Sequence, residues 1–221
     1  MQVNELMVRG IVVGVFQENC YIIGNRRTGE AICVDPGDES EEILHLAKDM
    51  GVRIKLIANS HAHIDHIMGV RGVQERTEAR FLLHPQDLWL VQEGWRSAAG
   101  WLGLKAEPPP LPDAPLADGD VVEVDGVRLQ VIHTPGHTQG SVCLYSDGML
   151  FSGDTLFLGS IGRTDLPGGD YQQIMASIVG RLLALPDDTV VLPGHMLQTT
   201  IRQERQTNPF IVQELRRQAG T

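Results

Sequence analysis

The feature that most constrains this chain is a seven-residue run, Ser60-His61-Ala62-His63-Ile64-Asp65-His66. Three histidines and one aspartate fall within it, directly after the apolar segment 54–58. Neutral imidazole nitrogens and carboxylate oxygens are the ligands that zinc and non-haem iron prefer. A strand that ends near Ser60 and turns into a helix near Asp65 would aim these side chains at one centre. We therefore predict a site for one or two metals at the end of a strand; the alternative is a histidine-rich turn that water solvates.

Composition narrows the class of protein. The chain has 221 residues, of which 42% are hydrophobic and 21% charged, as in ordinary globular proteins. Its formal net charge is -10 and no dense block of lysine or arginine occurs, which disfavours nucleic acid or an anionic membrane as the main partner. The amino terminus lacks the pattern of a signal peptide, and no apolar run is long enough to span a bilayer. We expect a cytoplasmic protein.

The cysteines support the same expectation. Cys20, Cys33 and Cys143 are far apart, odd in number and embedded in apolar runs. We predict that they are small, buried core residues in a reducing compartment. A cysteine metal ligand is the less favoured alternative, because none of the three stands beside a histidine motif.

The first half of the chain alternates strands and helices. Apolar runs within residues 6–35, separated by turn signals at 17–19 and 25–29, predict antiparallel strands. Ser40 is predicted to cap a helix that ends at Gly51. A strand over 54–59, a helix over 65–76, a strand over 79–83 and a helix over 85–102 follow.

Five prolines between 108 and 115 predict a stiff, non-helical connection. We interpret it as the crossing between two halves of one domain over residues 1–221. One hypothesis is that this connection forms a lid or substrate wall together with Trp95 and Trp101. The favoured alternative is a packed surface loop.

The second half repeats the style of the first. A hairpin over 121–132 turns at Asp125-Gly126, and strands over 141–145 and 149–152 follow. A helix over 171–185, a strand over 189–192 and a helical region from 198, interrupted at Asn208-Pro209, complete the chain. Strands come first in each half and helices follow. This order predicts an α/β (α+β) fold of four layers, with two packed sheets and helices on both outer faces.

Three further strand ends carry metal-type side chains, namely His137, Asp154 and His195. A glycine precedes each of them and lets the backbone turn sharply towards a crowded centre. Each is weak evidence alone, but together they repeat one arrangement of strand, glycine and ligand. The other three histidines, His45, His84 and His133, receive no metal role.

These residues together resemble the ligand set of the metallo-β-lactamase superfamily, whose members have an αββα sandwich, and the resemblance covers essentially the whole chain. The set comprises His61, His63, Asp65, His66, His137, Asp154 and His195. The segments 153–157, 159–165 and 204–209 are similar to glyoxalase II-like hydrolases and to persulfide dioxygenases.

The resemblance implies two divalent metal ions, zinc above all, although the same ligands also accept iron or manganese. The first ion would be bound by His61, His63 and His137, and the second by Asp65, His66 and His195. Asp154 would bridge them. Asp35 matches an aspartate that steadies the ligand loop; a plain turn residue before Pro36-Gly37 is an equal alternative.

The activity implied is hydrolysis of a small-molecule thioester such as S-lactoylglutathione, by a hydroxide held between the two metals and with Asp65 and Asp154 as the catalytic carboxylates. Arg163 could bind a substrate carboxylate, or equally could pair with Asp165 or Asp170. The main rival is a persulfide dioxygenase with one iron bound by two histidines and Asp154. A non-catalytic metal-binding protein is the third class, and it would predict a lost ligand.

Some positions depart from the family pattern. The chain ends soon after His195, which leaves no room for the helical glutathione-binding domain of full glyoxalase II enzymes and indicates the short type. Met196 stands where glycine is frequent, Ser60 where threonine is usual, and Gln139 where proline is common. The commonest β-lactamases have cysteine at the position of Asp154, so antibiotic hydrolysis is disfavoured. The oligomeric state is left open between a monomer and a homo-oligomer.

Overall fold

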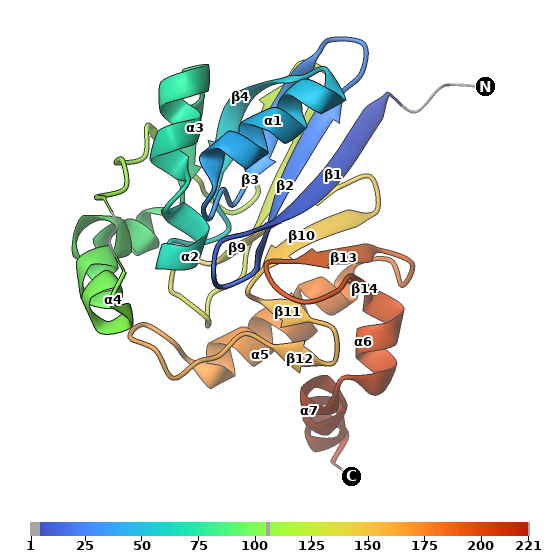
Figure 1. Ribbon diagram of the computed structural model, residues 1–221. Helices are drawn as coiled ribbons and strands as arrows, with labels where there is room; N and C mark the ends of the chain where they lie inside the picture. The colour runs from blue at the N-terminus through green and yellow to red at the C-terminus, as the bar shows by residue number, and fades with distance from the viewer. Residues whose placement is uncertain (1–4, 105–106, 221) are drawn as a thin grey trace.

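Two six-stranded sheets pack face to face, and helices cover their outer faces (Figure 1). The structure is a computed structural model that describes residues 5–104 and 107–220. The arrangement confirms the predicted four-layer α/β sandwich. Strands of the two sheets end at one common edge, where the residues singled out in the sequence gather.

The first sheet has the order β1-β2-β3-β4-β5-β6. The strands β1 to β3 are antiparallel, as predicted, whereas β3 to β6 run parallel. Their bounds are Leu6–Val13, Glu18–Asn25, Glu30–Val34, Arg53–Ala58, Arg80–Leu83 and Ala114–Pro115. The last of these strands lies in the proline-rich connection, at the sheet edge, where a missing N–H is tolerated.

The second sheet has the order β14-β13-β10-β9-β8-β7, in which only β10 and β13 are parallel. In chain order, β7 to β10, β13 and β14 span Val121–Val124, Val127–His133, Val142–Ser146, Met149–Gly153, Val190–Pro193 and Thr199–Thr200. A small separate ribbon pairs β11 (Leu156–Phe157) with β12 (Ser160–Ile161).

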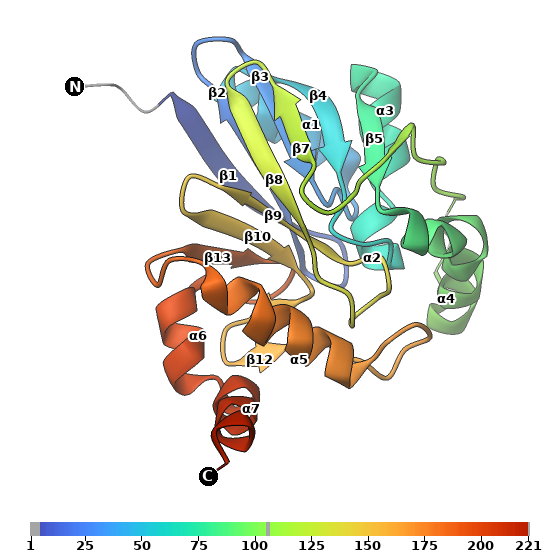
Figure 2. The same cartoon turned by 180° about the vertical axis from the view of Figure 1, so that it is seen from behind.

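The helices divide between the outer faces (Figure 2). The helices α1 and α3 lie on the first sheet, and α5, α6 and α7 lie on the second. In chain order, α1 to α7 span Ser40–Met50, Ile64–Ile67, Val70–Thr77, Trp95–Leu102, Tyr171–Gly180, Ile201–Thr207 and Pro209–Ala219. Over the described parts of the chain, none of the helices has the length and apolar character needed to cross a membrane.

Side-chain alternation along the strands explains the layers. Successive side chains of a strand point to opposite faces, so a continuous apolar run serves two cores. Ile22 and Cys33 pack under the helices of the first sheet, whereas the next-door Ile23 and Ile32 pack between the two sheets. A third cluster lies between the second sheet and its helices and includes Cys143. All three cysteines are buried and free, which confirms their predicted place in the core.

Two of the predicted helices differ from the structure at their beginnings or middles. Ser40 is the first residue of α1 and not its cap; Glu39 precedes it with φ of 45° and no side-chain cap bond. The predicted helix over 65–76 is two helices, α2 and α3, that break at Met68-Gly69. Gly69 donates its N–H to the carbonyl of Pro36, and a Cβ there would lie 2.7 Å from that oxygen. This close backbone approach interrupts the helix.

Two further helices are shorter than predicted. The region 85–102 consists of a 3₁₀ turn at Pro85–Asp87, a π-helical segment at Leu90–Gly94 and then α4. The helix predicted over 171–185 ends at Gly180, and a 3₁₀ turn over Leu182–Ala184 follows. The predicted break before Pro209 is confirmed, because the side chain of Asn208 caps α7 by accepting from the N–H of Phe210 and Ile211.

Candidate metal centre

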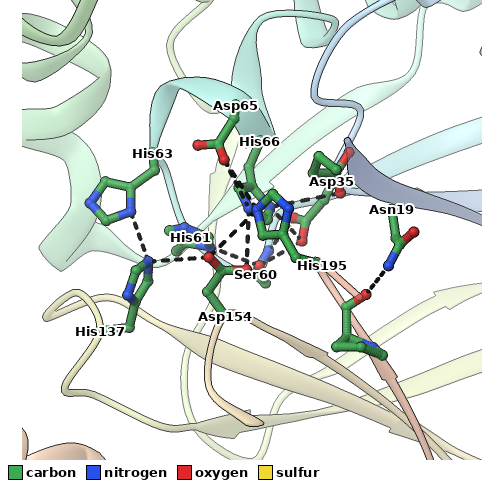
Figure 3. Close-up of polar contacts among 12 residues, drawn as sticks. Asn19, Asp35, Ser60, His61, His63, Asp65, His66, His137, Asp154 and His195 are labelled. Atoms are coloured by element: carbon green, nitrogen blue, oxygen red, sulfur yellow. Dashed lines mark hydrogen bonds and ion pairs between the residues drawn. The ribbon is translucent and has the colours of Figure 1, made fainter. Parts of the chain in front are cut away.

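All seven predicted ligands meet at the edge where the two sheets end (Figure 3). The run after β4 carries His61 and His63, and α2 begins directly afterwards and presents Asp65 and His66. The other three ligands follow strands of the second sheet. They are His137 after β8, Asp154 after β10 and His195 after β13. Ligands 134 residues apart in sequence, from His61 to His195, thus face one centre because both sheets stop at this edge.

The ligands form two sets. The nitrogens of His61, His63 and His137 lie within 4.8 Å of one another, with 2.8 Å between His63 Nδ1 and His137 Nε2. The atoms of Asp65, His66 and His195 also lie within 4.8 Å, with 3.2 Å between His195 Nε2 and Asp65 Oδ2. These are the sets that the resemblance implied for the first and the second metal.

Asp154 lies between the two sets. Its Oδ2 is 3.6 Å from His137 Nε2 and 3.7 Å from His195 Nε2, and its Oδ1 is 3.4 Å from His66 Nε2. One carboxylate therefore faces histidines of both sets, which is the placement of a bridging ligand.

The donor set fits metal ions. His61 Nε2, His66 Nε2 and Asp154 Oδ1 are buried and have no hydrogen-bond partner among the described residues. Buried polar atoms normally have partners, because leaving them unpaired costs free energy. Five imidazoles and two carboxylates facing one space would satisfy that need if they coordinated divalent cations such as zinc, iron or manganese.

Protonation favours coordination by most of the set. Burial lowers the pKa of His61 well below its usual value, and burial together with His137 lowers the pKa of His63 to about 3. Burial alone would raise the pKa of Asp154, but the neighbouring His66 outweighs it and lowers this pKa. Neutral imidazoles and an ionised carboxylate are the forms that bind metal.

His66 and His195 are the exceptions, because neighbouring carboxylates outweigh burial and raise the pKa of each. Burial favours the neutral form of His66, yet the carboxylates of Asp154 and Asp65 raise its pKa well above the usual value. This shift favours the protonated ring of His66 in the metal-free protein, whereas metal binding requires the neutral ring.

Hydrogen bonds orient the ligand rings. The Nδ1–H of His137 donates to the carbonyl of Arg163 at 2.8 Å, which turns its Nε2 lone pair towards the centre. His61 Nδ1 lies 3.0 Å from Ser60 Oγ, so its Nε2 also points inwards. His66 Nδ1 lies 3.2 Å from Asp35 Oδ2.

Asp35 holds the ligand loop. Ser60 donates both its backbone N–H and its hydroxyl to this carboxylate, each at 2.6 Å. Of the two interpretations of Asp35, the geometry agrees with the one that steadies the loop. Gly153 leaves room for this contact, because a Cβ at position 153 would lie 2.2 Å from Ser60 Oγ.

Sequence reasoning missed Asp87, a fully buried residue of the 3₁₀ turn after β5. Its carboxylate accepts the N–H of Ala62 at 3.1 Å, the N–H of Gly140 at 2.8 Å and the hydroxyl of Thr138 at 2.8 Å. It therefore joins the loop of His61 and His63 to the loop of His137. No motif surrounds Asp87, so no sequence signal pointed to it.

The segment 17–19, which the sequence predicts as a turn, also contributes to the site. Its residues Glu18 and Asn19 belong to strand β2 and not to a turn. Asn19 Nδ2 donates to the carbonyls of Pro193 and Met196, both at 3.0 Å, and so anchors the loop of His195. Glu18 is buried 3.8 Å from His66 Nδ1, and burial raises the pKa of its carboxyl. A charged residue at the start of a mostly apolar strand was the available signal.

Arg163 makes the ion pair that was considered as its alternative role. Its Nε and Nη2 donate to the two carboxylate oxygens of Asp165 at 2.7 and 2.8 Å. Asp170 instead caps α5. Arg163 still lines the cleft above the metal centre, and its binding of substrate stays a prediction.

That cleft has a volume of about 530 Å³ and its floor includes His63, Asp65, His137, Asp154 and His195. Apolar side chains form most of the remaining wall. The metal-type residues are thus reachable by a small molecule from outside.

Comparisons with known proteins agree with this geometry. The profile of the metallo-beta-lactamase superfamily matches residues 13–195. Hydroxyacylglutathione hydrolase GloC of Haemophilus influenzae is 33% identical over 204 residues, which cover 91% of this chain and 96% of that protein. The solved structure of BLEG-1 B3 metallo-beta-lactamase has a TM-score of 0.87 and 36% identity, covering 93% of this chain and 99% of that one. TTHA1623 in a di-iron-bound form has a TM-score of 0.83 and 42% identity, covering 91% and 99%.

The names of these relatives differ, since one is a hydroxyacylglutathione hydrolase, one is a B3 metallo-beta-lactamase and one is described by its two iron ions. Fold and family are common to all of them, whereas the substrate and the metal are not. The profile covers well over half of the chain and includes all seven of the convergent residues. The chain belongs to the metallo-β-lactamase superfamily.

Proposed function

We propose that this protein is a metal-dependent hydrolase of thioesters, such as S-lactoylglutathione or a related small acyl thioester. One observation carries the proposal, namely two ligand sets that share Asp154 at the floor of an open cleft. His61, His63 and His137 would hold one divalent ion, and Asp65, His66 and His195 the other. When bound, such ions lower the pKa of water and polarise a carbonyl oxygen.

The protein's own residues prepare the reaction. Ser60, Asp35 and the carbonyl of Arg163 orient three ligand rings before substrate arrives, which reduces the reorganisation needed during the reaction. Burial alone would raise the pKa of Asp65, but His66 and His195 outweigh it and lower this pKa, so the carboxylate is favoured in the ionised form that coordinates a metal. A thiolate is a good leaving group, so the mechanism needs no general acid beside the cleft.

The relatives support a thioester substrate in a short chain. GloC carries the name hydroxyacylglutathione hydrolase and is almost fully covered by this chain. A chain of this length is therefore compatible with that activity. We also propose a cytoplasmic location, since the three described cysteines are buried and unpaired.

An iron-dependent persulfide dioxygenase is the second candidate. The observation in its favour concerns the metal alone, because a protein 42% identical to this chain binds iron, as two ions. His61, His137 and Asp154 would supply the two histidines and one carboxylate that suit oxygen activation. The second ligand set speaks for the hydrolase, because a single-iron enzyme does not require it.

Two other classes are affected by the findings. The hypothesis of a non-catalytic metal-binding protein predicts that a ligand is lost or that the site is closed. All seven candidate ligand residues are present, and a cleft leads to them. Antibiotic hydrolysis was disfavoured because of Asp154. A B3 metallo-beta-lactamase that is 36% identical makes a cephalosporin a necessary comparison substrate.

The test is turnover of S-lactoylglutathione by the purified, metal-loaded protein, followed at the thioester absorbance. A kcat/KM above about 10⁴ M⁻¹s⁻¹ is expected for a thioesterase. Metal analysis, oxygen uptake with glutathione persulfide and hydrolysis of a chromogenic cephalosporin run in parallel. Oxygen uptake without thioester turnover would establish the dioxygenase instead.

A further inference from the structure

The wall of the cleft above the metal centre is apolar. Above the ligands, it is formed mainly by Phe16, Ile64, Trp101, Phe157, Ile161 and Met196. Two of these side chains stand open to solvent at the rim, since Trp101 is 82% and Met196 59% exposed. Large apolar side chains gathered at a concave site usually mark a place that binds something.

The apolar surface continues beyond this cleft. A neighbouring cleft of about 500 Å³ shares His63, Ala98, Trp101 and Leu166 with the first. Trp89 and Pro167 are among its other lining residues. Trp101, near the end of α4, therefore stands between two hollows, and an apolar surface leads from the metal centre past its ring.

Away from the metal centre, the side chains that line the two clefts offer little positive charge to an anionic group. Among the described residues that line them, Arg163 is the one lysine or arginine, and both carboxylate oxygens of Asp165 already occupy it. Glu93 adds a negative charge to the second cleft. The chain as a whole carries a formal net charge of -10. The carboxylates of glutathione would thus meet no unpaired cation of the described lining.

We propose that the substrate's acyl group is uncharged, apolar and longer than lactoyl, and that it lies across Trp101 and Met196. This inference rests on the proposed thioesterase function and, within it, favours a longer acyl thioester of an uncharged thiol over S-lactoylglutathione. In the reaction, water adds its oxygen to the acyl carbon and the carbon–sulfur bond breaks. The thiol leaves with one hydrogen of the water, and a fatty acid is the other product. Recognition then comes from the acyl chain and not from the thiol.

The first experiment compares acetyl to decanoyl thioesters of N-acetylcysteamine, an uncharged thiol, with the metal-loaded protein. We expect kcat/KM to rise about two- to fourfold for each methylene that the clefts bury. Trp101→Ala should flatten this rise. Leu111→Ala is the matched control, because Leu111 is also exposed, at 60%, but lines neither cleft. A glutathione thioester turned over faster than the N-acetylcysteamine thioester of the same acyl group would overturn the inference.

The second experiment measures binding without chemistry. S-alkyl thioethers of N-acetylcysteamine cannot be hydrolysed, and their binding should change the fluorescence of Trp101, with and without metal. Affinity should grow with alkyl length in the wild-type protein, and the signal should be lost in Trp101→Phe. Chain-length-dependent binding without thioester turnover would refute the proposed function but support the apolar site. Equal turnover of all thioesters without thioether binding would support the proposed function but refute the apolar site.

Discussion

Replacing Asp87 tests whether a residue outside the ligand set organises the metal centre. Its carboxylate joins the loop of His61 and His63 to the loop of His137 through the N–H of Ala62, the N–H of Gly140 and the hydroxyl of Thr138. Asp87→Ala removes all three acceptor contacts. Asp87→Asn keeps the shape of the side chain but loses one acceptor oxygen.

The size of the effect follows from the groups left behind. Asp87→Ala leaves two buried backbone N–H groups without acceptors, each costing about 1–3 kcal/mol. Thr138 keeps a partner, because Ser141 Oγ is 2.8 Å from its hydroxyl. Burial also raises the pKa of Asp87, so removing this carboxylate recovers part of the loss. We expect a net destabilisation of about 2–4 kcal/mol for alanine and about 1–2 kcal/mol for asparagine.

The decisive measurement is metal affinity, obtained by competition with a chromophoric chelator beside urea unfolding. When the loops of His61, His63 and His137 are misplaced, the metal site of this first set should bind its ion about 10- to 100-fold more weakly. The site formed by Asp65, His66 and His195 should keep its affinity. Asp113→Ala is the control, because Asp113 accepts from the N–H of Phe81 at 2.8 Å but contacts no ligand loop. Asp87→Ala with lowered stability and unchanged metal affinity would refute the reasoning and leave Asp87 a purely structural residue.

Three further predictions address the ligands directly. Asp154→Asn should keep the fold, as judged by circular dichroism, but lower metal occupancy and abolish hydrolysis, because one carboxylate serves both sets; unchanged turnover would contradict the two-metal mechanism. Gly194→Ala should lose metal, as measured by atomic absorption, because a Cβ at this position would lie 2.5 Å from Asp154 Oδ1. Gly180→Ala is the control and should retain the metal, because a Cβ there has no heavy atom within 4 Å. The third prediction concerns His63, whose pKa in the folded, metal-free protein is about 3. Between pH 6.5 and about 3 only the unfolded chain binds a proton at this histidine. The stability associated with neutral His63 is therefore complete above pH 6.5 and is lost as the pH falls towards about 3. Urea unfolding of wild type and His63→Gln between about pH 7.5 and pH 5 should therefore diverge by roughly 1–2 kcal/mol, and parallel curves would show that His63 is not held neutral.

Much of the fold could be predicted because its signals are local. Apolar runs, turn residues and capping side chains act over a few positions, so most of the strands and the break at Asn208-Pro209 were predictable. The errors occurred where a distant segment overrides a local preference. The backbone of Pro36 interrupts the helix at Gly69, and the side chain of Asp87 is tied to loops 25 and 53 residues away.

The ligand residues were predictable for a related reason. His61, His63, Asp65 and His66 lie so close in sequence that one strand end presents them together, and each remaining ligand follows its own strand and glycine. Residue type and spacing therefore identified all seven of the residues that meet in the structure. Their role as metal ligands stays a prediction that the metal analyses test.

By itself, the sequence determined the alternation of side chains that builds the layers and the chemistry available at the strand ends. Only the tertiary structure decided that Asp154 faces both ligand sets, that Asp165 occupies Arg163, and that the cleft has an apolar wall. The physical reason is that periodicity and turn chemistry act between neighbours in the chain. The contacts that select a substrate join segments which become neighbours only when the two sheets pack.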